Sequence, residues 1–108
     1  MKKDSRKYEW SKQRKKLGFD DRELWSLDHT IAKFVLPRLI RFKEVECGYP
    51  GNLTEKKWDK ILDQMIYSME AVCDEWKGKI SLIDAQVEEK RINRGLCLFG
   101  KYFRGLWW

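Results

Sequence analysis

The chain is poor in the residues from which metal sites and disulfide scaffolds are built. Its 108 residues include one histidine, His29, and three widely spaced cysteines, Cys47, Cys73 and Cys97. An odd number of cysteines argues against a disulfide scaffold, and a single histidine argues against a zinc site. We therefore expect reduced cysteines and no bound metal.

Catalytic motifs are also missing. The sequence contains no GxxxxGK[ST] phosphate loop and no GxGxxG, HExxH, GxSxG or CxxC pattern. Its adjacent carboxylates, at Asp20-Asp21, Asp74-Glu75 and Glu88-Glu89, are typical of helix caps and solvated helix faces. We expect a protein that is not an enzyme and that carries no cofactor.

Long hydrophobic runs are absent as well. No apolar stretch approaches the roughly 18 residues that a membrane-spanning helix needs, and the N-terminus lacks the hydrophobic segment of a secretory signal. These features predict a cytoplasmic protein without membrane contact. With 43% hydrophobic and 37% charged residues, the chain suits one small domain.

Positive charge gathers at the N-terminus. Residues 1–16 hold eight Lys or Arg and two acidic residues, whereas the rest of the chain has 15 basic and 15 acidic residues. We predict a mobile basic arm over residues 1–20, followed by one helical domain over residues 21–108. The arm is either a solvated tail or a weak nucleic-acid contact, in which Tyr8 and Trp10 would stack on bases.

Hydrophobic periodicity predicts two well-defined helices. The first begins between Asp21 and Ser26 and ends near Val45, before a turn-rich connection. The second begins after Thr54, a good N-cap, and ends before Gly78. Its apolar residues recur at helical spacing and are expected to face the core: Trp58, Ile61, Leu62, Met65, Ile66, Met69, Val72, Cys73 and Trp76.

A third helix is expected from about Ser81 to Phe103. Its predicted core positions are Ile83, Val87, Ile92, Leu96, Phe99 and Phe103. Three glycines mark a kink, a close backbone approach or the helix end, namely Gly95, Gly100 and Gly105. Because no strand pattern competes, the predicted fold is all-α, a three-helix antiparallel bundle with a flexible basic N-terminal arm.

The first predicted helix places charges and a proline where a core-facing stripe is expected. That sector holds Asp28, Ile31, Val35, Arg38, Leu39 and Phe42. Pro37 interrupts it at a cost of about 3 kcal/mol in a regular helix, so compensation or function is implied. Arg38 either forms a buried ion pair near residues 59–63 or lines a cleft for an anionic ligand. In the second case Lys33 shares the cleft and Trp25 forms a stacking wall.

The C-terminal sequence FGKYFRGLWW interleaves bases with aromatics. Nucleotide-binding surfaces have this composition, and so do protein interfaces. Two terminal tryptophans, Trp107 and Trp108, also favour a homo-oligomer, since a monomer would leave them exposed. The ligand-binding residues predicted from both segments are Trp25, Lys33, Arg38, Lys101, Tyr102 and Arg104.

Several segments resemble a family of small bacteriophage proteins. In order along residues 25–107 they read WSLDxTIAxF, PRLxxF, GYP, FGKYF and LW. The resemblance covers this range in patches and leaves out the basic arm. It implies a phage gene product that acts in the cytoplasm of a bacterial host, and it carries over no activity, ligand or catalytic residue.

Small phage proteins without enzymatic activity often bind host factors, which is an analogy by source. The leading hypothesis is a counter-defence protein that sequesters a small anionic ligand, such as a signalling nucleotide, through the first and third predicted helices. One alternative is an inhibitor or adaptor that docks on a host protein through the Trp-rich C-terminus. Another is a nucleic-acid-binding accessory protein that uses the arm. A phosphate ligand bound in a pocket between helices would favour the first, a flat apolar patch without a pocket the second, and loss of DNA or RNA binding on deletion of residues 1–16 the third.

Overall fold

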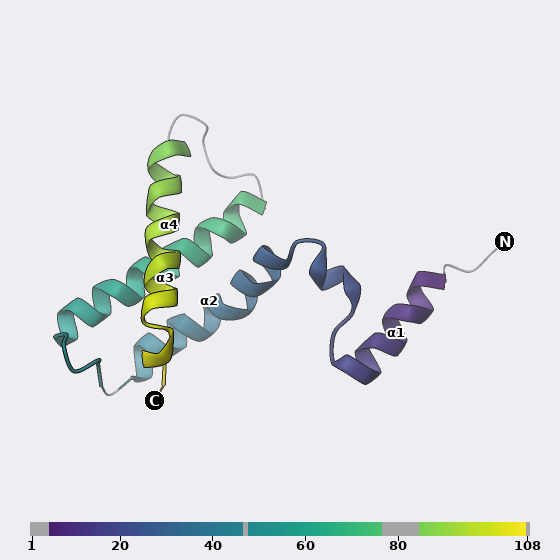
Figure 1. Cartoon of the computed structure of the whole chain (residues 1–108), viewed down its shortest axis with the longest axis horizontal. Helices are drawn as coiled ribbons and strands as arrows, with labels where there is room; N and C mark the ends of the chain where they lie inside the picture. The colour runs from purple at the N-terminus through teal and green to yellow at the C-terminus, as the bar shows by residue number, and fades with distance from the viewer. Residues whose placement is uncertain (1–4, 47, 77–84, 108) are drawn as a thin grey trace.

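A computed structural model describes residues 5–46, 48–76 and 85–107. This part of the chain is all-helical and contains no strand, which confirms the predicted fold class. The elements in order are α1 (Ser5–Leu17), the 3-10 helix η1 (Asp21–Leu24), α2 (Leu27–Val45), α3 (Glu55–Trp76), α4 (Ala85–Lys101) and the 3-10 helix η2 (Phe103–Gly105) (Figure 1).

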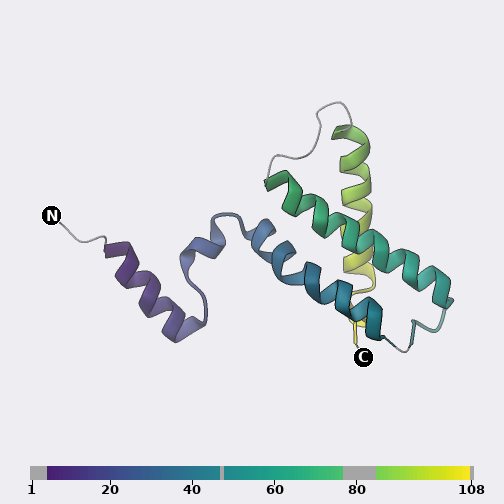
Figure 2. The same cartoon turned by 180° about the vertical axis from the view of Figure 1, so that it is seen from behind.

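Helix α3 is the centre of a body formed by α2, α3 and α4. Both α2 and α4 pack along α3, whereas the described residues of α2 and α4 make no close backbone contact with each other. Figures 1 and 2 show α2 running beside α3 in the opposite direction and α4 crossing α3. The predicted three-helix antiparallel bundle is therefore not confirmed, because the third side between α2 and α4 stays open.

The molecule is extended rather than round. Its Cα radius of gyration is 17.6 Å and its principal extents are 62 × 39 × 20 Å, whereas a compact domain of this length has a radius of gyration of roughly 13 Å. The shortest extent corresponds to about two stacked helices. Helix α1 extends away from the body and packs only against η1 among the described elements (Figure 1).

The core lies along α3, as the sequence predicts. Its fully buried side chains include Trp58, Leu62 and Met65, and each of these stabilises the fold by about 1.5–3 kcal/mol through burial. The Thr54 hydroxyl accepts a 3.3 Å hydrogen bond from the Lys57 backbone N–H. The predicted N-cap of this helix is thereby confirmed.

The face that α2 presents to α3 differs from the predicted stripe. Ala32 and Leu39 are buried, whereas Ile31 is about half exposed and Asp28 and Arg38 are exposed. The face of α2 that contains Ala32 and Leu39 joins the core cluster, and the charged positions point outward. The prediction that both charges face the core is wrong.

The helix continues through Pro37, which has no backbone N–H to bond the Lys33 carbonyl oxygen. Pro37 lies inside α2 on an exposed position. The Arg38 guanidinium donates a 2.8 Å hydrogen bond to the Phe34 carbonyl oxygen in the same turn. This bond goes to the carbonyl one residue after the one that Pro37 leaves without its helical donor, so it anchors the Arg38 side chain along α2.

Helix α4 comes closest to α3 at Gly95. A Cβ atom there would collide with the Ser68 hydroxyl and the Gln64 carbonyl oxygen. The buried Ser68 hydroxyl donates a 2.7 Å hydrogen bond to the Ile92 carbonyl oxygen. Of the three explanations offered by the sequence for its glycines, the close backbone approach holds for Gly95.

The contact face of α4 is narrower than predicted. Ile92 is buried and Phe99 packs against the core. Val87, Leu96 and Phe103, which were expected in the core, are exposed at 63%, 39% and 59%. Since α3 is the one long helix of the described residues that α4 packs on, positions to either side of this contact line remain exposed. Ser81 and Ile83 of the predicted third helix, Gly78 and Trp108 lie outside the described residues.

The N-terminal segment departs most from expectation. Residues 5–17 of the arm predicted over residues 1–20 form α1, and we call α1 and η1 together with residues 18–20 and Trp25 the N-terminal unit. The buried carboxylate of Asp20 pairs with Arg14 at 2.7 Å and with Arg22 at 2.8 Å. Periodicity could not predict this packing, because it consists of ion pairs and one contact between the Trp10 and Trp25 rings.

Candidate functional site

The open side of the body forms an apolar groove. We name it the α2–α4 groove, and it is lined by Phe34, Val35, Arg38, Leu39, Phe42, Phe99 and Leu106, around a volume of about 210 Å³. Val35, Phe42 and Leu106 reach inward to the core cluster, so the floor of the groove is continuous with the core. Its upper wall is exposed, since Phe34 keeps 60% of its surface accessible.

Cations border this groove. The Arg38 guanidinium carbon lies 3.7 Å from the centre of the Phe34 ring, in a stacked cation–π contact. A second hollow of about 410 Å³ adjoins it and is lined by Arg38, Arg41, Phe42 and Val45. Arg41 pairs with Glu44 at 3.0 Å across exposed surface, so its charge is partly offset.

The C-terminal end of α4 extends the apolar surface beyond the groove. The Phe99 and Phe103 rings meet edge to face at 5.5 Å, and Trp107 is 77% exposed. Exposed aromatics at the rim of an apolar hollow are typical of protein interaction surfaces. This is the region in which the sequence predicted either a nucleotide contact or an interface.

The predicted ligand residues of α2 do not share one cavity. Trp25 is two-thirds exposed and meets the Trp10 ring at 5.8 Å in the N-terminal unit. Lys33 lines a separate hollow of about 350 Å³ with Glu23, His29, Thr30 and Phe34. Arg38 lies in the α2–α4 groove, on the other side of Phe34. Trp25 is therefore not a wall of the Arg38 site.

The three predicted ligand residues at the end of α4 have different surroundings. The Tyr102 ring packs edge to face on the buried Trp58 ring at 5.8 Å, so one of its edges is already used in the core. The Lys101 ammonium lies 5.4 Å from the centre of the Tyr102 ring. Arg104 is exposed in η2.

The proposed ion pair of Arg38 with residues 59–63 does not form. Arg38 is exposed and contacts the Phe34 ring and carbonyl. Lys43, which lies deeper between α2 and α3, pairs with Asp63 at 2.6 Å instead. That hydrogen bond raises the pKa of the Lys43 ammonium. The correction follows from the rotation of α2, which brings Lys43 rather than Arg38 toward α3.

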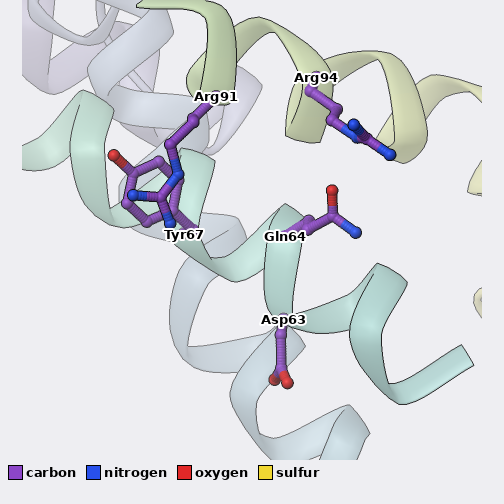
Figure 3. A pocket seen from close by; sticks show the side chains of 5 residues that line it. All are labelled: Asp63, Gln64, Tyr67, Arg91 and Arg94. Carbon is purple, nitrogen blue, oxygen red and sulfur yellow. The ribbon is translucent and has the colours of Figure 1, made fainter. Parts of the chain in front are cut away.

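A polar cleft lies between α3 and α4 and was not predicted from the sequence. It encloses about 170 Å³ and is lined by Asp63, Gln64, Tyr67, Arg91 and Arg94 (Figure 3). The guanidinium carbon of Arg91 lies 4.1 Å from the centre of the Tyr67 ring. The spacing of Arg91 and Arg94 on one helix face could have been noticed, but which face of α4 meets α3 depends on Gly95.

The described residues contain no cluster of side chains typical of a metal site. No group of three or more His, Cys, Asp or Glu side chains among them could hold a metal ion. Cys73 is buried and Cys97 is exposed, both as free thiols, and Cys47 lies outside the described residues. No helix in the described ranges is long and apolar enough to cross a membrane.

The strongest electrostatic perturbation in the described residues is outside these cavities. The Arg22 guanidinium, hydrogen-bonded to the Asp20 carboxylate, holds the pKa of Asp20 well below its usual value, and the same contact raises the pKa of Arg22. The Asp20 carboxylate also accepts from the Arg22 backbone N–H at 3.0 Å. These contacts hold η1 in place, and the Asp20 carboxylate is fully buried.

Comparisons with known proteins leave the chain's own geometry as the guide to its function. No protein-family model matches it, and neither the curated proteins nor the solved structures include a match.

Proposed function

We propose that this protein is a non-enzymatic docking module that binds an acidic amphipathic helix of a partner protein in the α2–α4 groove. The observation that carries the proposal is an apolar groove continuous with the core, left open between two helices that both pack on a third. Under the phage resemblance, the partner would be a bacterial host protein that docking inhibits or recruits.

The shape of the groove favours a helix as its occupant. Helices pack 8–10 Å apart, so a helix laid between α2 and α4 would contact both and complete a four-helix arrangement around α3. Helix-in-groove recognition uses apolar side chains at spacings of three and four residues. Phe34, Phe42 and Phe99 line the groove and offer aromatic surface to such side chains.

The charge around the groove favours an acidic partner. Arg38 lies within the groove and Arg41 lines the adjoining hollow, and the residues that line these two hollows include no carboxylate. Charge complementarity of this kind speeds association and selects partners. The homo-oligomer expected from the C-terminal tryptophans stays a prediction from the sequence.

The exposure of the groove favours docking over enclosure of a nucleotide. Pockets that enclose small ligands bury most of the ligand surface. The α2–α4 groove and the hollow that adjoins it hold about 210 and 410 Å³, but the Phe34 wall of the groove is 60% exposed. Sequestration of a signalling nucleotide by Trp25, Lys33, Arg38, Lys101, Tyr102 and Arg104 stays a prediction from the sequence.

The test uses a synthetic helical peptide of about 18 residues with leucines on one face and glutamates along its flanks. We expect its fluorescence anisotropy to rise on titration with the full chain, and the Lys-for-Glu version of the peptide to bind at least about tenfold more weakly. Phe34→Ala should reduce the affinity about tenfold, because it removes exposed aromatic contact area without opening the core.

The matched control is Tyr8→Ala, since Tyr8 is 65% exposed on α1 and lies outside the groove lining. Equal loss of affinity in both variants, or equal binding of both peptides, would contradict the proposed site.

Helix α1 supports a second candidate function, a contact with nucleic acid. It extends from the body and carries three basic residues in its last turn, Arg14, Lys15 and Lys16. Neutralising phosphates with such residues gives salt-dependent binding. Removal of residues 1–16 should abolish binding to single-stranded DNA at low salt while peptide docking persists, and unchanged DNA binding would exclude this role.

A further inference from the structure

We infer that the cleft between α3 and α4 is a binding site for a phosphate monoester, held by Arg91 and Arg94 with Gln64. The cleft is separate from the α2–α4 groove, and the inference does not depend on the docking function. It rests on the side-chain geometry of the cleft and on the charges left uncompensated there (Figure 3).

Arg91 is held in place before any ligand binds. Its guanidinium stacks on the Tyr67 ring, and the Tyr67 hydroxyl in turn donates a hydrogen bond to the Glu88 carboxylate. Stacking leaves the edge N–H donors of a guanidinium available, and these match the oxygens of a phosphate in pairs. A preformed donor also loses less conformational entropy on binding.

Asp63 and Gln64, which also line the cleft, each bond to another residue of the chain. Asp63 turns away from the two arginines, where its carboxylate pairs with Lys43 at 2.6 Å (Figure 3). Gln64 donates an amide N–H to the Lys60 carbonyl oxygen at 3.3 Å. Figure 3 shows the head groups of Gln64 and Arg94 near each other across the cleft. A negative charge that could compete with a ligand is thus directed elsewhere.

The lining of the cleft carries an excess of positive charge. Arg91 and Arg94 are exposed residues three positions apart on α4, a spacing at which like charges repel. In the described part of the chain no carboxylate forms an ion pair with either guanidinium. Glu88, which accepts from Tyr67, offsets one charge in part. An oxyanion between the two guanidiniums would remove the remaining repulsion.

The close packing of the two helices fixes the position of the cleft. Gly95 brings the α4 backbone against Ser68 and Gln64 of α3, so the arginines on the same side of α4 lie over Tyr67 and Gln64. The volume of about 170 Å³ suits an oxyanion head group with its hydration. It is too small to enclose a whole nucleotide, so a base or sugar would remain outside.

The experiment follows the side-chain amide of Gln64 and the Nε–H groups of Arg91 and Arg94 by NMR, at constant ionic strength. Inorganic phosphate and adenosine monophosphate are titrated separately, with adenosine as the neutral control. We expect saturable shifts of these three side chains with both phosphates and none with adenosine. Tighter binding of the monophosphate would assign the site to a nucleotide, and equal binding would assign it to the phosphate alone.

Variants test the residues. Arg94→Gln should weaken phosphate binding at least about tenfold, because it removes a charged pair of donors. Arg104→Gln is the matched control, since Arg104 is an exposed arginine in η2 and lies outside the cleft lining. Absence of saturable shifts in the parent chain, or an equal loss in both variants, would overturn the site in favour of diffuse attraction to positive charge. Peptide docking in the α2–α4 groove should be unaffected by Arg94→Gln.

Discussion

The N-terminal unit and the body are built by different interactions. In the body, apolar side chains such as Leu62 and Met65 are completely buried along α3. In the N-terminal unit, the fully buried side chain is the carboxylate of Asp20, which two arginines and the Arg22 backbone N–H surround. Apolar packing stabilises the body, whereas ion pairs stabilise the N-terminal unit. A substitution that removes a charge should therefore affect the two regions differently from one that alters packing.

The link between these regions is thin. The Thr30 hydroxyl donates a 2.9 Å hydrogen bond to the Glu23 carbonyl oxygen, and η1 contacts the start of α2. Units joined by few contacts open with separate free energies. We therefore expect α1 to exchange its amide protons well before α3 does.

The largest effect should come from Gly95→Ala, which attacks the body where two helices touch. The new methyl group would collide with the Gln64 carbonyl oxygen and the Ser68 side chain, and overpacking of this kind costs about 1–3 kcal/mol. Gly100→Ala is the control, because nothing lies within 4 Å of a Cβ there. It should raise the free energy of unfolding by about 0.5–1 kcal/mol, because alanine favours the helix over glycine. Urea unfolding measures both. A destabilisation of equal size in both variants would refute the close approach.

Asp20→Asn attacks the N-terminal unit and should have a smaller, local effect. The amide cannot form ion pairs with Arg14 and Arg22, so η1 loses its fastening and α1 its anchor. Since the folded-state pKa of Asp20 is lowered, its contribution is complete at neutral pH and is lost only as the pH falls through that lowered pKa.

Hydrogen exchange separates this outcome from general unfolding. Protection of α1 amides should fall in Asp20→Asn while protection of α3 amides is unchanged, and Asp28→Asn, at an exposed position on α2, should change neither. Loss of α3 protection in Asp20→Asn would show that the two regions fold as one.

The difference between these regions also explains what could be predicted from the sequence. Helix α3 was predicted almost to its ends, because its apolar residues repeat at helical spacing and Thr54 caps it. The N-terminal unit has no such repeat. Its helix depends on contacts of Arg14 and Trp10 with Asp20 and Trp25, and these pairings have no periodic pattern in the sequence.

The candidate sites were less predictable for a related reason. The sequence indicates Arg38 and Lys33 as exceptional residues, but their neighbours depend on the rotation of α2 about its axis, which buries Ala32 and Leu39. Arg91 and Arg94 were missed because a charged helix face is ordinarily solvated. Their placement over α3 depends on a contact made at Gly95 between residues far apart in the chain.

Glu46 ends α2 and lies near Asp59 of α3. It allows the effect of a charged group to be measured within the body itself. One carboxyl oxygen of Glu46 is buried and has no hydrogen-bond partner among the described residues. Burial raises the pKa of Glu46, and the nearby charges of Asp59 and Glu55 raise it further. The ionised form of Glu46 is therefore disfavoured in the folded protein, whereas the ionised form of Asp20 is favoured.

We expect Glu46→Gln to stabilise the protein slightly at neutral pH. A folded-state pKa above the unfolded value stabilises the fold at low pH, and that contribution is lost as the pH rises through the folded pKa. The substituted amide would carry no charge to desolvate, so the gain should be on the order of a few tenths of a kcal/mol after solvent screening and should vanish below about pH 4. Urea unfolding at acidic and neutral pH measures it, with the exposed Glu70→Gln as control. A gain independent of pH would mean that the side chain acts through packing rather than charge.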